Sequence, residues 1–111
     1  MSVEDRKSVR IESEQFISYT VYDAENRVCD RGMALAKDVS KTGVALENMK
    51  PIEVGLHVEL SIALKDELVN TKGIVRNLSN IDDSKYLIGI EFTNITKEEL
   101  EKLRSEFPNI L

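Results

Sequence analysis

The 111-residue sequence has no tryptophan, a single cysteine (Cys29), and only 5% aromatic residues. One cysteine excludes an intrachain disulfide, which suits a reducing compartment. Scarce aromatics disfavour a broad surface for stacking nucleic-acid bases. No hydrophobic run approaches the length of a membrane-spanning helix, and none follows the charged N-terminus as in a signal peptide. These absences predict a cytoplasmic protein that does not insert directly into a membrane.

Basic residues are also outnumbered. The chain carries 15 Lys and Arg against 20 Asp and Glu, a formal net charge of −5 at pH 7. Binding of DNA or RNA depends on neutralising many phosphates, so neither is expected as a partner. The excess of acidic groups is concentrated in the C-terminal part, however. Residues 1–43 hold 7 basic and 8 acidic groups, whereas residues 44–111 hold 8 basic and 12 acidic groups. The N-terminal part can therefore hold a local site for a small anion.

Signs of catalysis are missing as well. The sequence shows no paired nucleophile and base, no phosphate-cradling glycine loop, and no cluster of metal ligands around Cys29 or the only histidine, His57. We therefore expect a protein that is not an enzyme and that has no metal site and no cofactor.

Short segments of alternating apolar residues predict a mostly β fold. The strands expected from this alternation cover residues 16–22, 33–39, 44–47, 58–64, 68–78 and 86–92. Residues 23–31 are polar and are interpreted as a turn or loop. Gly73, within the fifth strand, is interpreted as a bulge or bend.

The last segment changes to a helical period. Thr96 followed by Glu99 forms a capping-box pattern at its start. The apolar residues expected on one face of this helix are Leu100, Leu103 and Phe107. The pattern as a whole predicts a small six-stranded antiparallel β-barrel with a C-terminal α-helix that covers an open end or edge. Residues 1–15 are expected to be a flexible N-terminal arm, and residues 16–111 the barrel domain with its helix.

Two short motifs stand out against this background. Residues 6–10, Arg-Lys-Ser-Val-Arg, form an RxxxR in the arm, and residues 38–43, Asp-Val-Ser-Lys-Thr-Gly, form a DxSxxG at the end of the second strand. In this order, flanking the first strand, they resemble the signature of the PilZ family. Residues 73–76 (Gly-Ile-Val-Arg) and 86–92, with a Gly-x-x-Phe ending, look like later strands of the same family. The resemblance covers roughly residues 6–107.

The resemblance implies a receptor for the bacterial second messenger cyclic di-GMP, with a site made of Arg6, Arg10, Asp38, Ser40 and Gly43. Such residues suit the ligand, because arginine forks pair with phosphate oxygens or the guanine edge. An ionised aspartate accepts hydrogen bonds from guanine's ring N–H and amino group. Secondary candidates are two residues that add attraction, Lys7 and Lys41, and Arg76, which either approaches the ligand or pairs with a surface acid.

Each motif also has a plainer interpretation. RxxxR occurs a second time, from Arg27 to Arg31, although that pair follows the first strand instead of preceding it. Asp-x-Ser near a glycine also forms an ordinary turn whose side chains bond the local backbone.

The function expected from the resemblance is that of a sensor or adaptor. It would change conformation on binding cyclic di-GMP and signal to a separate, unidentified protein partner. The alternatives are a PilZ-like adaptor that acts without nucleotide and, more remotely, a small barrel of SH3-like or oligonucleotide-binding type. Whether one or two nucleotides bind is open at this point.

Overall fold

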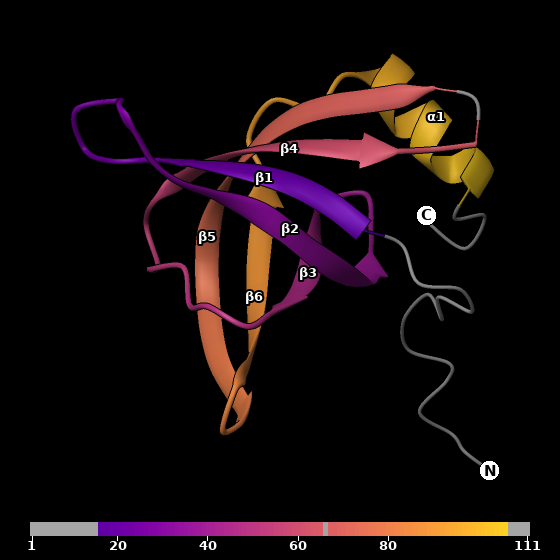
Figure 1. The fold of residues 1–111 in the computed structure, drawn as a ribbon. Coiled ribbons are helices and arrows are strands. Elements are labelled where there is room, and N and C mark those ends of the chain that lie inside the picture. Colours follow the sequence, from indigo (N-terminus) through magenta and orange to yellow (C-terminus); the bar gives the residue numbers. More distant parts are fainter. Residues whose placement is uncertain (1–15, 66, 107–111) are drawn as a thin grey trace, which may run out of the picture.

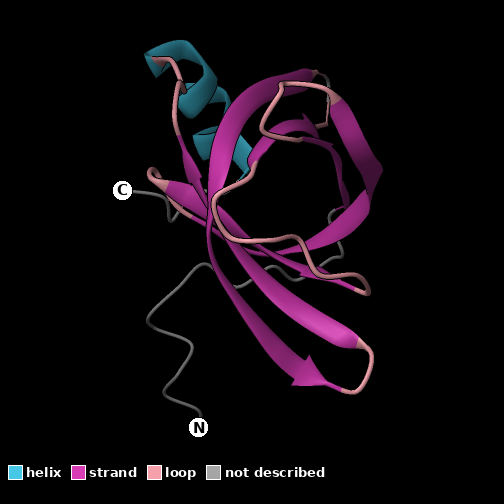
Figure 2. Ribbon diagram, turned by 90° about the vertical axis from the view of Figure 1, so that its left-hand side faces the viewer, coloured by secondary structure: helices cyan, strands magenta, loops and turns pink. Residues whose placement is uncertain are grey.

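The computed structural model describes residues 16–65 and 67–106. Six antiparallel strands form a closed barrel in the order β1-β2-β3-β6-β5-β4, and the ring of strands is visible in Figure 2. The strands are β1 (Phe16–Tyr22), β2 (Val28–Val39), β3 (Gly43–Asn48), β4 (His57–Ala63), β5 (Leu68–Asp82) and β6 (Lys85–Phe92). The one helix among the described residues, α1 (Lys97–Glu106), follows them (Figure 1). The predicted fold class is therefore confirmed.

The barrel closes around a core built by alternation. In β4 the three residues Val58, Leu60 and Ile62 are at most 1% exposed, and their neighbours along the strand face outward. Strands β1 and β6 contribute buried residues with the same period. Burial of each such side chain stabilises the fold by about 1.5–3 kcal/mol. Because one face of every strand is buried, the register between neighbouring strands is tightly specified.

The second strand is longer than the sequence predicts. The segment interpreted as a loop over residues 23–31 is a turn only as far as Arg27, and β2 begins at Val28. The start of β2 pairs with the end of β1, as in the partners Val21 and Asp30. The first part of β2 extends past the core, so residues on both of its faces are exposed there. This part of the strand therefore has no alternation of apolar and polar residues.

The bulge or bend expected at Gly73 is not found at that residue. Gly73 pairs in regular register with Val58 on β4 and Phe92 on β6. A Cβ at Gly73 would lie 2.6 Å from the carbonyl oxygen of Glu91, so the glycine permits close packing of two strands. The register of β5 shifts instead between Val75 and Asn77 and again between Asn80 and Asp82.

The helix begins with the predicted capping box. The Thr96 amide donates to the Glu99 carboxylate, and the Glu99 amide donates to the Thr96 hydroxyl, both at 3.0 Å. The helix packs against β5 and places Leu103, which is 0% exposed, in the core. Phe107 lies outside the described residues. Within the described ranges no helix has the length and apolar character needed to cross a membrane.

Candidate functional site

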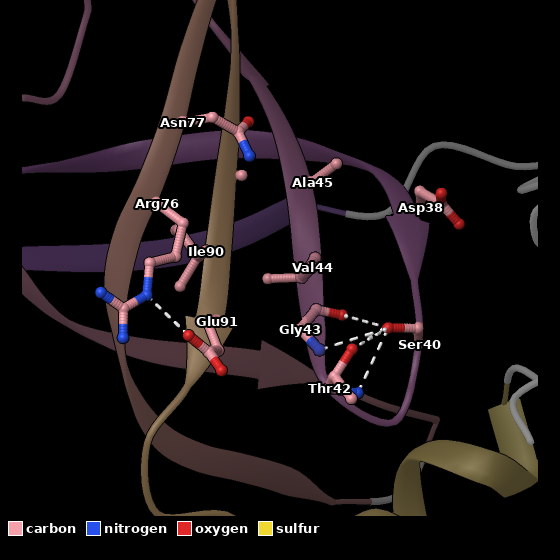
Figure 3. Close-up of a pocket in the computed structure, with 11 residues that line it drawn as sticks. Asp38, Ser40, Thr42, Gly43, Val44, Ala45, Arg76, Asn77, Ile90 and Glu91 are labelled. Atoms are coloured by element: carbon pink, nitrogen blue, oxygen red, sulfur yellow. Dashed lines mark hydrogen bonds and ion pairs between the residues drawn. The ribbon is translucent and has the colours of Figure 1, made fainter. Parts of the chain in front are cut away.

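An open hollow of about 330 Å³ lies where the end of β2 meets β3, β6 and β5 (Figure 3). Asp38 and Ser40 border it on one side and Arg76 on the other, with β3 and β6 between them. Its lining residues are Asp38, Ser40, Thr42, Gly43, Val44, Ala45, Arg76, Asn77, Gly89, Ile90 and Glu91. The three charged members of this set are Asp38, Arg76 and Glu91, so the described lining has a formal charge of −1.

A β-bulge in β2 turns Asp38 away from the core. Ala36 and Val39 are both buried, at 2% and 1% exposed, although they are three positions apart along the strand. The register shift between Ala36 and Asp38 leaves Lys37 as the extra residue. Without it, the period of two would place Asp38 on the core face beside Ala36. The bulge thus keeps a carboxylate that would be costly to bury on the outer wall of the barrel.

A second bulge shapes the opposite side of the hollow. In β5 the register shifts between Val75 and Asn77, and both Arg76 and Asn77 are exposed while Val75 is fully buried. Asn77 pairs with Gly89, Gly89 with Ala45, and Ala45 with Asp38. These four residues form one row across four strands, with polar side chains at its ends and small residues in its middle. The row therefore makes a floor between two polar walls.

Two glycines allow the strands and side chains of this floor to approach closely. A Cβ at Gly43 would overlap the carbonyl oxygen of Ile90 and lie 3.2 Å from the Cα of Glu91. At Gly89 a Cβ would lie 2.5 Å from the amide oxygen of Asn77, whose side chain lies over that position. Gly43 is thus required by the pairing of β3 with β6.

The Ser40 hydroxyl holds the turn between β2 and β3 together. Its oxygen accepts from the amides of Thr42 and Gly43, both at 3.2 Å, and lies 3.1 Å from the Thr42 hydroxyl. The Ser40 amide donates to the Gly43 carbonyl at 2.9 Å. This is the local turn chemistry that the plainer interpretation of DxSxxG expects. The same hydroxyl is exposed at the rim of the hollow.

Arg76 pairs with a surface carboxylate, as one of its two expected roles requires. Its Nε donates to Glu91 Oε1 at 2.6 Å. Of the other two guanidinium nitrogens, one points away from Glu91 and one points downward (Figure 3). The side chains are 56% and 50% exposed, so this ion pair is worth at most about 1 kcal/mol.

The structure brings together four of the residues singled out from the sequence, namely Asp38, Ser40, Gly43 and Arg76. Lys41 is exposed in the same turn but does not line the hollow. The arm residues Arg6, Lys7 and Arg10 lie outside the described residues.

The competing RxxxR is remote from this region. Arg27 lies in the turn between β1 and β2, where it pairs with Asp23 and Glu25. It is eleven residues before Asp38, roughly 36 Å along an extended strand. The geometry therefore gives Arg27 no role at the hollow.

Sequence reasoning missed three polar residues of the lining, namely Thr42 within the DxSxxG and, outside that motif, Asn77 and Glu91. Asn77 directly follows Arg76, the last residue of the segment 73–76, and Glu91 lies within the segment 86–92, both of which the resemblance covers. The available signal for Glu91 was its outward phase between buried Ile90 and Phe92, whereas Asn77 shares the phase of buried Val75 and faces outward only because of the bulge. No group of three or more potential metal ligands gathers among residues 16–65 and 67–106.

Solved structures share this barrel. The PilZ domain with c-di-GMP of YcgR from Escherichia coli matches with a TM-score of 0.68 and 14% identity, covering 93% of this chain and 86% of that one. MrkH from K. pneumonia matches with a TM-score of 0.70 and 15% identity, covering 99% of this chain and 50% of that one. The Bacillus subtilis Inhibitor of motility, MotI/DgrA, matches with a TM-score of 0.63 and 17% identity, covering 96% of this chain and 54% of that one. The chain thus spans about half the length of the last two proteins, and at these identities the likeness is one of fold.

The family itself is given by the sequence model of the PilZ domain, which matches residues 4–107. The chain belongs to the PilZ domain family. A comparison with curated protein sequences finds no match.

Proposed function

We propose that this protein is a cyclic di-GMP receptor that acts on a separate protein and catalyses no reaction. The observation that carries the proposal is the shared position of Asp38, Ser40, Gly43 and Arg76 around one open hollow, in a PilZ domain. One structural neighbour, the PilZ domain of YcgR, is described with c-di-GMP.

The chemistry of the hollow suits part of such a ligand. Asp38 offers a carboxylate, which accepts the paired N–H donors of guanine. Ser40 offers a hydroxyl at the rim, and Gly43 adds a lining position without a side chain. The hollow's volume of about 330 Å³ is near the lower end of ligand pockets, which run from about 300 to 1,000 Å³. A cyclic dinucleotide would therefore need further cover, which we assign to the arm.

The position of β1 makes that cover possible. Phe16, the first described residue, pairs with Leu35, three residues before Asp38 on β2. Arg10 is six residues before Phe16, so its Cα lies within about 20 Å of it whatever the conformation between them. Asp38 is about 10 Å further along β2 than Leu35. Arg10 therefore has the reach to meet a ligand held at Asp38, and Arg6 can extend across it.

The proposed response follows from the charges. The described lining carries a net negative charge, so a ligand with two phosphates needs cations from elsewhere. Arg6 and Arg10, assisted by Lys7 and Lys41, would supply them. Ordering of the arm over the ligand then presents a changed surface to the partner protein. We place this exchange in the cytoplasm.

Calorimetry of cyclic di-GMP with the full chain tests the proposal. Arg6→Ala, Arg10→Ala and Asp38→Ala should each weaken binding by about 1–3 kcal/mol, because each removes a charged contact. Arg27→Ala is the matched control, since it removes the same side chain from the other RxxxR and should leave affinity unchanged.

Wild-type affinity below detection would refute the receptor proposal and favour the nucleotide-independent adaptor. That alternative has one observation behind it: the fold alone accounts for Ser40 and Gly43, through the turn and the strand pairing. The expectation that neither DNA nor RNA is a partner rests on the net charge of −5 and on the scarcity of aromatic residues. MrkH, one structural neighbour, is described as a transcription regulatory factor.

A further inference from the structure

The hollow contains an ion pair whose anionic member faces the place proposed for an anionic ligand. Arg76 is the extra residue of the β5 bulge, and Glu91 lies on β6 in the pair directly across from Gly43. Both line the hollow. Resting on the proposed function, we infer that Glu91 competes with the phosphate of the ligand for Arg76 and so lowers the affinity of the site.

The geometry of the pair leaves Arg76 ready to change partner. Only Nε donates to Glu91, and one of the two terminal nitrogens points away from it (Figure 3). A guanidinium binds phosphate best through two parallel N–H donors. Those two donors are thus available for a phosphate oxygen pair without a change in the backbone.

The exchange costs little because the pair is exposed. The Arg76 side chain is 56% exposed and the Glu91 side chain 50%, so water solvates each when they separate. The bulge helps as well, because Arg76 has no cross-strand partner in the β5–β6 register. Its side chain is therefore held chiefly by the contact with Glu91.

Glu91 also opposes the ligand by its charge. With Asp38 it makes two carboxylates against one guanidinium in the described lining. Asp38 has a proposed use in binding guanine, whereas Glu91 has none and repels phosphate at short range. Removal of the Glu91 charge should therefore increase affinity, which is the opposite of the usual effect of changing a residue in a binding site.

The experiment measures cyclic di-GMP affinity of the full chain by calorimetry for Glu91→Gln, Arg76→Gln and the double variant. Glu91→Gln keeps the size of the side chain and should bind about three- to tenfold tighter. The double variant should bind at least about fivefold more weakly than Glu91→Gln alone, because a released Arg76 contacts the ligand.

Glu101→Gln is the matched control. Glu101 belongs to another exposed pair, with Arg104 at 3.1 Å on α1, and the variant changes the net charge equally. It should leave affinity within about twofold of wild type, because it is on α1 and not at the hollow. Thermal unfolding confirms that each variant is folded.

The outcomes separate this inference from the proposed function. If wild type binds cyclic di-GMP and Glu91→Gln binds it no more tightly, the competition is refuted and the receptor proposal stands. A double variant that binds as tightly as Glu91→Gln overturns the role of Arg76. Absence of binding by wild type and by every variant overturns both, whereas binding gained only in Glu91→Gln supports the competition and overturns the receptor proposal.

Discussion

Gly43 offers the clearest test of how the DxSxxG motif combines structure and binding. We expect Gly43→Ala to destabilise the barrel whether or not ligand is present. The new Cβ would overlap the carbonyl oxygen of Ile90 and lie 3.1 Å from its carbonyl carbon. These are backbone atoms of a paired strand, so no side-chain rotation relieves the contact.

The magnitude follows from the separation that β3 and β6 must undergo. A Cβ needs about 3.5 Å from a carbon atom, so the strands must move apart locally. Overpacking of this kind costs about 1–3 kcal/mol. Weakening one neighbouring ladder hydrogen bond adds about 0.5–1.5 kcal/mol. The expected loss is therefore about 2–4 kcal/mol, a large part of the 5–15 kcal/mol typical of a domain.

Urea unfolding followed by circular dichroism measures this loss. Thr42→Ala, the matched control at the preceding position, removes an exposed side chain whose hydroxyl lies 3.1 Å from that of Ser40, and it should cost less than about 1 kcal/mol. If Gly43→Ala were within about 0.5 kcal/mol of wild type, the argument from strand proximity would be wrong. A variant that is stable but does not bind nucleotide would show that the glycine serves ligand approach alone.

Two further predictions concern the rest of the barrel. Leu103→Ala should lower the free energy of unfolding by about 2–4 kcal/mol, because Leu103 is 0% exposed in the core; a loss below about 1 kcal/mol in urea would show that α1 is not anchored there. The hydrogen bond from Lys50 lowers the pKa of Asp30, so the pair stabilises the fold above the carboxyl's ordinary pKa near 4 and ceases to do so as the pH falls through the lowered value. The advantage of wild type over Asp30→Asn, at most about 1 kcal/mol for so exposed a pair, should accordingly shrink in acid. Urea unfolding at a series of pH values checks this, and an advantage that grew in acid would contradict it.

The barrel was predictable from sequence wherever one strand face is buried. Val58, Leu60 and Ile62 show the period of two because the core selects every second side chain. The start of β2 was not predictable, because residues such as Val28 and Cys29 extend past the core and are exposed. The capping box at Thr96 was predictable because its hydrogen bonds are local.

The hollow was predictable only in part. Asp38, Ser40 and Gly43 lie within six residues of one another, so a motif can contain them. Glu91 and Asn77 join them through pairing with β3 and with β6, which depends on closure of the barrel. The bulge at Arg76 likewise depends on the pairing of β5 with β6. No local sequence signal indicates that Arg76, and not Gly73, is the bulged residue.

The row from Asp38 through Ala45 and Gly89 to Asn77 has a consequence for how a ligand would affect the whole molecule. Its members come from both halves of the chain, and they become neighbours only when β3 and β6 pair. A bound molecule that contacts all four residues would link the N-terminal half of the chain to the C-terminal half. Occupancy should therefore slow amide exchange throughout the interior of the barrel, and a peptide carrying the DxSxxG segment alone should show no affinity.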